Sequence, residues 1–224
     1  FVDVDDTIIE VHGHTKQGVG FGYSGVRGLN ALLATVTTPN SAPVIVGQRL
    51  RKGSCGSPRG AHRFIADALA TTRRLPAMTG KKILVRADSA FYGRPSISAA
   101  ITAGADVSVT VRMDPNVKRA IDHIPVDAWQ TIKYTNAIFD DNTGRWISSA
   151  EVAEVPFTAF ASKKAADQVP GRLVVRRIPE LNKKDVDQPG LFDLHRFHAV
   201  FTTADTGLLD TVAADKTHRQ HAII

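Results

Sequence analysis

The sequence has little of several residue types and patterns, and each scarcity excludes a class of protein. Its 224 residues include one cysteine, Cys55, which rules out an internal disulfide and is typical of a reducing compartment. No apolar run approaches the roughly 18 residues that a membrane-spanning helix requires. No low-complexity tract interrupts the chain. We therefore expect a folded protein whose partners do not include a membrane.

The composition that is present indicates a globular protein with a sizeable core. Hydrophobic residues make up 43% of the chain and charged residues 22%, which is the balance of a folded domain rather than a disordered one. The formal net charge is +6, and the isoelectric point is near 9.6. This moderate excess of positive charge favours polyanionic partners, although many metabolic enzymes carry as much.

The segment KKILVRADSAFYG, Lys81–Gly93, predicts a short buried strand that ends in a carboxylate. The apolar residues Ile83, Leu84 and Val85 lead toward Asp88, and turn-forming residues follow it. Such a strand delivers its final side chain to the carboxyl edge of a sheet, where α/β proteins place their chemistry. A lone aspartate at this position is also common as a helix cap, so both interpretations stay open here.

A second acid-bearing strand is predicted at the start of the chain, in FVDVDDTIIEVHG. The alternation of a strand places Asp3 and Asp5 on one face and Asp6 on the other. Three acids within a β-run are costly unless they meet water, a metal or a ligand. The pattern favours a functional site, with an edge strand that has a solvated face as the alternative.

The order of the predicted elements is β-β-β-α-β-α-β, which indicates an α/β fold with a mixed sheet flanked by helices. The elements after the first strand are strands at Leu29–Thr38 and Pro43–Arg51, a helix starting at Pro58, the Asp88 strand, a helix from Pro95 to Gly104, and a strand at Asp106–Arg112. The glycine-rich segment Gly13–Gly28 lacks the spacing of a dinucleotide or phosphate loop, and it predicts a β-turn instead.

The pattern changes after residue 128, and this predicts three parts. Residues 1–128 form the first part of the core, residues 129–204 form an inserted antiparallel β subdomain, and residues 205–224 return to a helix. The helix is expected from Thr206, with Leu208, Leu209 and Val212 on one face.

Two chemistries suit the acid-bearing strands. DVDDT matches the D-x-D-x-T start of haloacid-dehalogenase-like phosphatases, in which Asp3 attacks phosphorus and Asp5 acts as acid and base. That fold needs a later strand with two acids, and RADSAFYG offers one. Alternatively, one aspartate in the first strand and one after the fourth is the layout of a ribonuclease-H-like core, which holds two metal ions for phosphodiester chemistry.

Several segments together resemble the DDE transposases of bacterial insertion sequences, in the branch with a β-rich insertion before the last acid. They are VDVDDTIIEVHG, GYSGVRG, RLRKGS with GAHRFI, RADSAFYG and the terminal THRQHAII. The resemblance implies a ribonuclease-H-like endonuclease that cleaves and joins DNA strands during transposition, using two Mg²⁺ ions with Mn²⁺ as a substitute. It implies that Asp5 and Asp88 are catalytic metal ligands and that Asp3 is a neighbouring ligand.

The same resemblance implies partners and further site residues. Contacts to DNA are expected from Arg219, His221, Arg176, Arg177, Lys183 and Lys184. The active complex is expected to be a homodimer on the transposon ends and target DNA, in the bacterial cytoplasm at the nucleoid. The third acid, a glutamate, is expected directly after Ile224, so the chain as given is expected to have little or no activity. A non-catalytic DNA-binding remnant is the remaining alternative.

Overall fold

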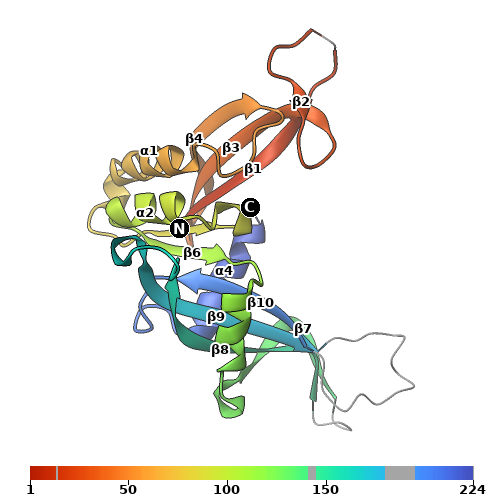
Figure 1. The fold of residues 1–224 in the computed structure, drawn as a ribbon, viewed down its shortest axis with the longest axis vertical. Helices are drawn as coiled ribbons and strands as arrows, with labels where there is room; N and C mark the ends of the chain where they lie inside the picture. Colours follow the sequence, from red (N-terminus) through yellow and green to blue (C-terminus); the bar gives the residue numbers. More distant parts are fainter. Residues whose placement is uncertain (14, 141–144, 180–194, 224) are drawn as a thin grey trace.

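One mixed β-sheet organises the molecule, as shown in Figure 1. The computed structural model describes residues 1–13, 15–140, 145–179 and 195–223. Within these residues the sheet has ten strands in the order β2-β3-β1-β5-β6-β10-β9-β8-β7, and β4 pairs with β3. The fold is therefore α/β with parallel and antiparallel pairing in one sheet, as the sequence predicts.

The first part of the sheet is an antiparallel meander. It consists of β1 (Val2–Glu10), β3 (Arg27–Thr38) and β4 (Ser41–Lys52), with the two-residue β2 (Gly20–Phe21) at the edge of β3. Apolar and β-branched residues dominate β1 and β3, which suits a half-buried pleated surface. The two strands predicted after the glycine-rich segment are confirmed, and each extends a few residues further than expected.

Two short parallel strands continue the sheet on the other side of β1. β5 (Leu84–Ala87) runs parallel to β1, and β6 (Asp106–Thr110) runs parallel to β5. Such parallel neighbours need crossover connections, which the chain supplies as α1 (Ala61–Arg73) and α2 (Arg94–Thr102). The predicted order of strands and helices in this half is confirmed, with β2 as an additional small element.

The predicted start of the first helix is wrong by three residues. Residues 57–60 form turns, and α1 begins at Ala61 after Gly60, whose φ of 73° lies in the left-handed region. Pro58 is compatible with a β-turn and with the first turn of a helix, so the sequence pattern alone does not distinguish the two structures. The helix after β6 is α3 (Pro115–Asp122), and the Asp114 side chain accepts hydrogen bonds from the Asn116 and Val117 backbone amides at its start.

The second half of the chain extends the same sheet with antiparallel strands. These are β7 (Gln130–Asp140), β8 (Arg145–Ala159), β9 (Val169–Pro179) and β10 (His195–Thr202), and β10 pairs with β6. The expected β-rich character of this region is confirmed. The division into three domains stays a prediction, because the strands pair continuously from one region to the next.

The chain returns to helix in α4 (Thr211–Arg219), which is followed by the 3-10 helix η5 (Gln220–Ile223). The expected start at Thr206 is wrong: Asp210 caps the helix, and Leu208 lies before it with 52% of its surface exposed. The other 3-10 turns are η1 (Pro76–Met78), η2 (Ser89–Phe91), η3 (Val126–Ala128) and η4 (Ala165–Asp167). Among the described residues, no helix combines the length and the apolar character needed to cross a bilayer.

Candidate active site

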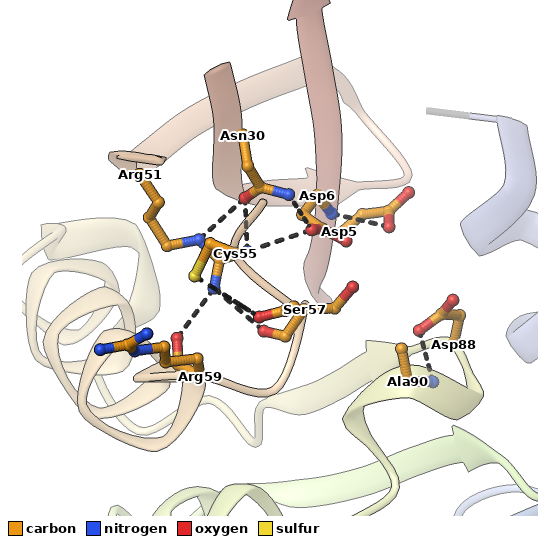
Figure 2. Close-up of polar contacts among 10 residues, drawn as sticks. Asp5, Asp6, Asn30, Arg51, Cys55, Ser57, Arg59, Asp88 and Ala90 are labelled. Carbon is orange, nitrogen blue, oxygen red and sulfur yellow. Dashed lines mark hydrogen bonds and ion pairs between the residues drawn. The ribbon is translucent and has the colours of Figure 1, made fainter. Parts of the chain in front are cut away.

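The two predicted acids lie side by side where the parallel pairing of β1 and β5 stops. Val4 of β1 pairs with Ala87, the last residue of β5; Asp5 is the next residue of β1, and Asp88 directly follows β5. Because side chains alternate along a strand, both carboxylates lie on the same face of the sheet. Both residues are exposed and line one groove with a volume of about 1030 Å³ (Figure 2). The fold therefore brings together two acids that are 83 residues apart in sequence.

Neighbouring groups bias the protonation of Asp5. Although the residue is exposed, the protein around its carboxylate removes part of its water and raises its pKa, and the negative charges of Asp88 and Asp6 raise it further. The Asp6 backbone amide, which donates to Asp5 Oδ1 at 2.7 Å, and the nearby His221 act in the opposite direction. The charge of Asp88 thus reaches Asp5, and a cation bound at these carboxylates would reduce the repulsion between them.

Asp88 also has the capping role that the sequence left open. Its Oδ1 accepts a hydrogen bond from the Ala90 backbone amide at 2.9 Å, at the start of η2 (Figure 2). The cap fixes the direction of the carboxylate at the end of β5. The structural and functional interpretations are compatible, because a capped carboxylate keeps lone pairs for a second partner.

Asp3 has a different environment although it lies on the same face as Asp5. It is 4% exposed, and its two oxygens accept from Arg86 at 2.6 and 2.8 Å and from Thr37 at 2.7 Å. Burial alone would raise its pKa, but hydrogen bonds from His221, Arg86 and Thr37 outweigh burial and lower the pKa to about 2. Asp3 is therefore an ionised partner of Arg86.

Arg86 links the sheet to the C-terminal helix. Its side chain is fully buried beside Asp3, and its guanidinium lies 4.4 Å from the centre of the Phe1 ring. Its Nη1 donates to the Thr217 carbonyl in α4 at 2.5 Å. A buried arginine needs such a set of acceptors, and the set holds α4 against this face.

The donor chemistry of the pair fits a hard divalent cation. Mg²⁺ prefers oxygen ligands, and in many enzymes one or two carboxylates hold it together with water and substrate phosphates. Asp5 and Asp88 supply that kind of donor, whereas the oxygens of Asp3 are occupied by Arg86. In the described part of the chain, no group of three or more His, Cys, Asp or Glu side chains is placed to hold a metal.

The third acid of DVDDT, Asp6, belongs to a polar network that borders the same groove. Arg51 donates to Asp6 at 3.0 Å and to Asn30 at 2.8 Å, and it also donates to the carbonyls of Ser57 at 3.0 Å and Arg59 at 2.8 Å. Figure 2 shows these contacts meeting at the guanidinium. The network ties the loop after β4 to β1 and β3, so it fixes one wall of the groove.

Three of the residues expected to contact DNA lie around α4. Arg219 Nη1 lies 3.8 Å from Asp215, and Arg176 Nε lies 4.0 Å from it. Asp215 is 4% exposed, and burial raises its pKa against the attraction of both arginines. His221 Nδ1 lies 3.3 Å from Asp3 Oδ1, which places it beside the candidate site.

The remaining expected contacts do not form one track. Arg177 follows Arg176 in β9 and therefore lies on the other face, where it pairs with Glu151 at 2.6 Å and stacks over Trp129 at 4.2 Å. Lys183 and Lys184 lie outside the described residues. A DNA role for these residues stays a prediction, and a single strand passing over both Arg176 and Arg177 is incompatible with strand alternation.

Sequence reasoning missed Arg86, although a signal for it exists. Arg86 interrupts an otherwise apolar strand two residues before Asp88, which marks a buried cation that requires an acid partner. Reasoning from motifs also missed the exposed aromatic residues Phe21 and Tyr23 and the cation Arg112, which line the same groove as the acids. No spacing motif marks them as ligand-binding residues, and only the fold brings them to the groove.

The candidate site is thus a groove lined by Asp5 and Asp88, with a wall fixed by the pairing of Arg51 with Asp6, and it lies beside the buried pair of Asp3 and Arg86. Its assignment depends on these residues and their geometry. Comparisons with protein-family models and with curated proteins find no match for this chain.

Proposed function

We propose that this chain is the catalytic part of a DNA transposase, an enzyme that cleaves DNA strands at the ends of an insertion sequence and joins them to target DNA. The observation that carries the proposal is the position of Asp5 and Asp88 on one face, side by side where the parallel pairing of β1 and β5 stops. Carboxylates so placed are the kind of oxygen donor that holds divalent ions for metal-assisted phosphodiester chemistry.

The order of the strands supports a ribonuclease-H-like core within this proposal. The antiparallel meander of β4, β3 and β1 is followed by β5 and β6, which run parallel to β1. This order matches the layout that the sequence pattern predicts for such a core. The strands β7–β10 occupy the position of the predicted β-rich insertion, after the second acid and before α4.

The proposed roles of the residues follow from their surroundings. Asp5 and Asp88 hold two Mg²⁺ ions, for which Mn²⁺ substitutes; such ions, when bound, activate the attacking hydroxyl and stabilise the leaving oxygen. Asp3 is assigned to Arg86 rather than to metal, because both of its oxygens are engaged. His221 is placed to meet a DNA phosphate near the acids. The partner is DNA, bound by a homodimer in the active complex.

The phosphatase alternative needs an accessible nucleophile at Asp3. That carboxylate is 4% exposed, and it is bonded to Arg86, Thr37 and His221. A nucleophile must approach phosphorus directly, so a carboxylate enclosed in this way is poorly suited to attack. The transposase proposal uses the exposed Asp5 instead, and it needs no change in these contacts.

Strand cleavage by the full-length protein tests the proposal. Asp5→Asn and Asp88→Asn should each reduce Mg²⁺-dependent nicking of end-containing DNA by at least about a hundredfold, because each removes a carboxylate that would hold a catalytic metal. Asp122→Asn, in an exposed position at the end of α3, is the matched control and should retain activity.

Metal binding by the chain gives a readout that is independent of activity. Electron paramagnetic resonance of Mn²⁺ should show binding that both groove variants weaken and Asp122→Asn leaves unchanged. Full nicking by Asp5→Asn would overturn the proposal. Salt-sensitive DNA binding without any metal-dependent cleavage by the full-length protein would favour the non-catalytic remnant.

A further inference from the structure

Two exposed aromatic side chains line the groove that contains Asp5 and Asp88. Phe21 is 65% exposed and Tyr23 is 104% exposed, and both line the same groove as Asp5 and Asp88. Val26, which is 38% exposed, lines it beside them. Exposure of large apolar side chains to water is unfavourable, and their grouping at one cavity indicates a surface that binds a ligand.

The segment that carries these rings is fixed at its base. Backbone segments cross closely there: a Cβ added to Gly53 would lie 2.0 Å from the Gly28 carbonyl oxygen and 2.4 Å from that of Gly20. The Gly53 amide also donates to the Gly18 carbonyl at 3.0 Å. Glycine permits this contact because it has no Cβ. The rings therefore project from a base that is packed backbone against backbone, which limits the entropy lost on binding.

Positive charges line both the groove and the cavity next to it. Arg112 is exposed and lines the groove together with Phe21 and Tyr23. Lys52 and Arg59 are also exposed and line an adjoining cavity of about 360 Å³, which shares Ser54 and Cys55 with the groove. Cations that flank exposed rings are the arrangement that binds a single-stranded nucleic acid, because phosphates meet the cations and bases stack on the rings.

We propose that Phe21 and Tyr23 form a stacking surface for the bases of an unpaired nucleic-acid segment that lies in this groove. This inference rests on the proposed function, because the strand held by the rings would be the one whose phosphate reaches Asp5 and Asp88. Every base has a π-face, so the surface holds a strand without reading its sequence. The flanking cations favour this occupant over a second copy of the chain, which carries a net charge of +6.

Binding of a short single-stranded DNA to the chain tests the inference directly. The probe is a dodecamer of thymidine with a fluorescent 2-aminopurine at its centre, and the readouts are anisotropy and base fluorescence. Phe21→Ala and Tyr23→Ala should each weaken binding by about tenfold, because one stacked base is lost. Stacking should also quench the 2-aminopurine in the unmodified chain and not in the double variant.

Matched substitutions separate stacking from other effects. Tyr23→Phe keeps the ring and should bind as the unmodified chain does, whereas Tyr23→Leu keeps apolar volume without a ring and should match Tyr23→Ala. Phe139→Ala removes another exposed aromatic residue, 44% exposed in β7, and should leave binding unchanged. A dodecamer that is abasic at every position and carries a terminal dye should bind the unmodified chain and the double variant equally.

The outcomes distinguish this inference from the proposed function. Unchanged oligonucleotide binding by the double variant overturns the stacking surface, even if Asp5→Asn still abolishes cleavage. Ring-dependent binding with cleavage that does not require Asp5 supports the surface and rejects the transposase proposal. Equal binding by Tyr23→Leu and the unmodified chain, or a dimer in sedimentation that the double variant disrupts, would also overturn it.

Discussion

The two halves of β1 place chemically identical side chains in opposite environments. Residues 2–4 lie between β3 and β5, and here Asp3 is 4% exposed and paired with Arg86. From Asp5 onward β1 pairs with β3 alone, and the strand borders the groove. The length of the neighbouring strand β5 thus decides whether an aspartate on this face stabilises the fold or is available to a ligand.

The largest expected difference between the two halves is in stability. Asp3→Ala should lower the free energy of unfolding by about 3–5 kcal/mol, because Arg86 is left buried without its acid. Asp5→Ala should change it by no more than about 0.5 kcal/mol. Urea denaturation measures both. The double variant Asp3→Leu with Arg86→Met should be more stable than Asp3→Leu alone, and an equal cost for Asp3→Ala and Asp5→Ala would contradict the comparison.

Helix α4, which packs beside Asp3 and Arg86, should make the stability of the protein depend on pH. His218 is 8% exposed between Ser108 at 3.0 Å and Thr110 at 2.8 Å, and burial lowers its pKa from 6.5 to about 4, with nearby positive charges adding to the effect. The unfolded chain therefore binds the proton more readily. The free energy of unfolding should fall by about 3 kcal/mol as the pH drops from 6.5 to 4.

Denaturation of matched variants at several pH values isolates this contribution. His218→Gln should be less stable at pH 7 and should lose most of the dependence between pH 6.5 and 4. His62→Gln, in an exposed position of α1, should keep it. A pH dependence that is unchanged by His218→Gln would assign the effect to other groups.

The segments beside the exposed half of β1 cross at Gly53, and their stability should depend on this backbone contact rather than on a side-chain core. Gly53→Ala should destabilise the chain by roughly 1–3 kcal/mol, since its Cβ would lie 2.0 Å from the Gly28 carbonyl oxygen. Gly56→Ala, in the same loop, has no neighbour closer than 4.0 Å and is the control. Thermal unfolding compares them, and equal melting temperatures would show that the crossing of backbones is not tight.

The smallest expected effect is stabilisation of the chain by a divalent ion bound at Asp5 and Asp88. At an Mg²⁺ concentration about five times the dissociation constant, binding should stabilise the unmodified chain by about 1 kcal/mol. Asp5→Asn and Asp88→Asn should not respond, whereas Asp122→Asn should behave as the unmodified chain does. Thermal shift with Mg²⁺ and with matched ionic strength of sodium chloride measures the difference. Stabilisation that persists in both groove variants would place the ion elsewhere.

Much of the fold was predictable because local signals agree with it. The strands around Leu29–Thr38 and the helix after Pro95 follow from β-branched runs, turn residues and apolar periodicity. The errors occurred where local signals are degenerate. Pro58 fits a turn as well as a helix start, and Leu208 and Leu209 fit a helical stripe although the Asp210 cap begins α4 after them.

The site was predictable in part for the same reason. The patterns of two strands marked Asp88 and the acids of DVDDT as candidates, and the period of a strand placed Asp3 and Asp5 on one face. The resemblance to known transposases then singled out Asp5 and Asp88. The period of the strand does not show that Asp3 is buried and paired whereas Asp5 is exposed. Only the register between β1 and β5, and the buried Arg86 opposite Asp3, separated the two.

The sequence alone determined the element order, the positive charge and the pair of strands that carry acids, since each depends on local pattern or composition. The tertiary structure decided which acid is buried, which arginines pair with acids and which aromatic rings reach the groove. These depend on where strands stop and cross, as at Gly53 and at the end of β5. Such contacts join residues distant in sequence, and no local pattern records them.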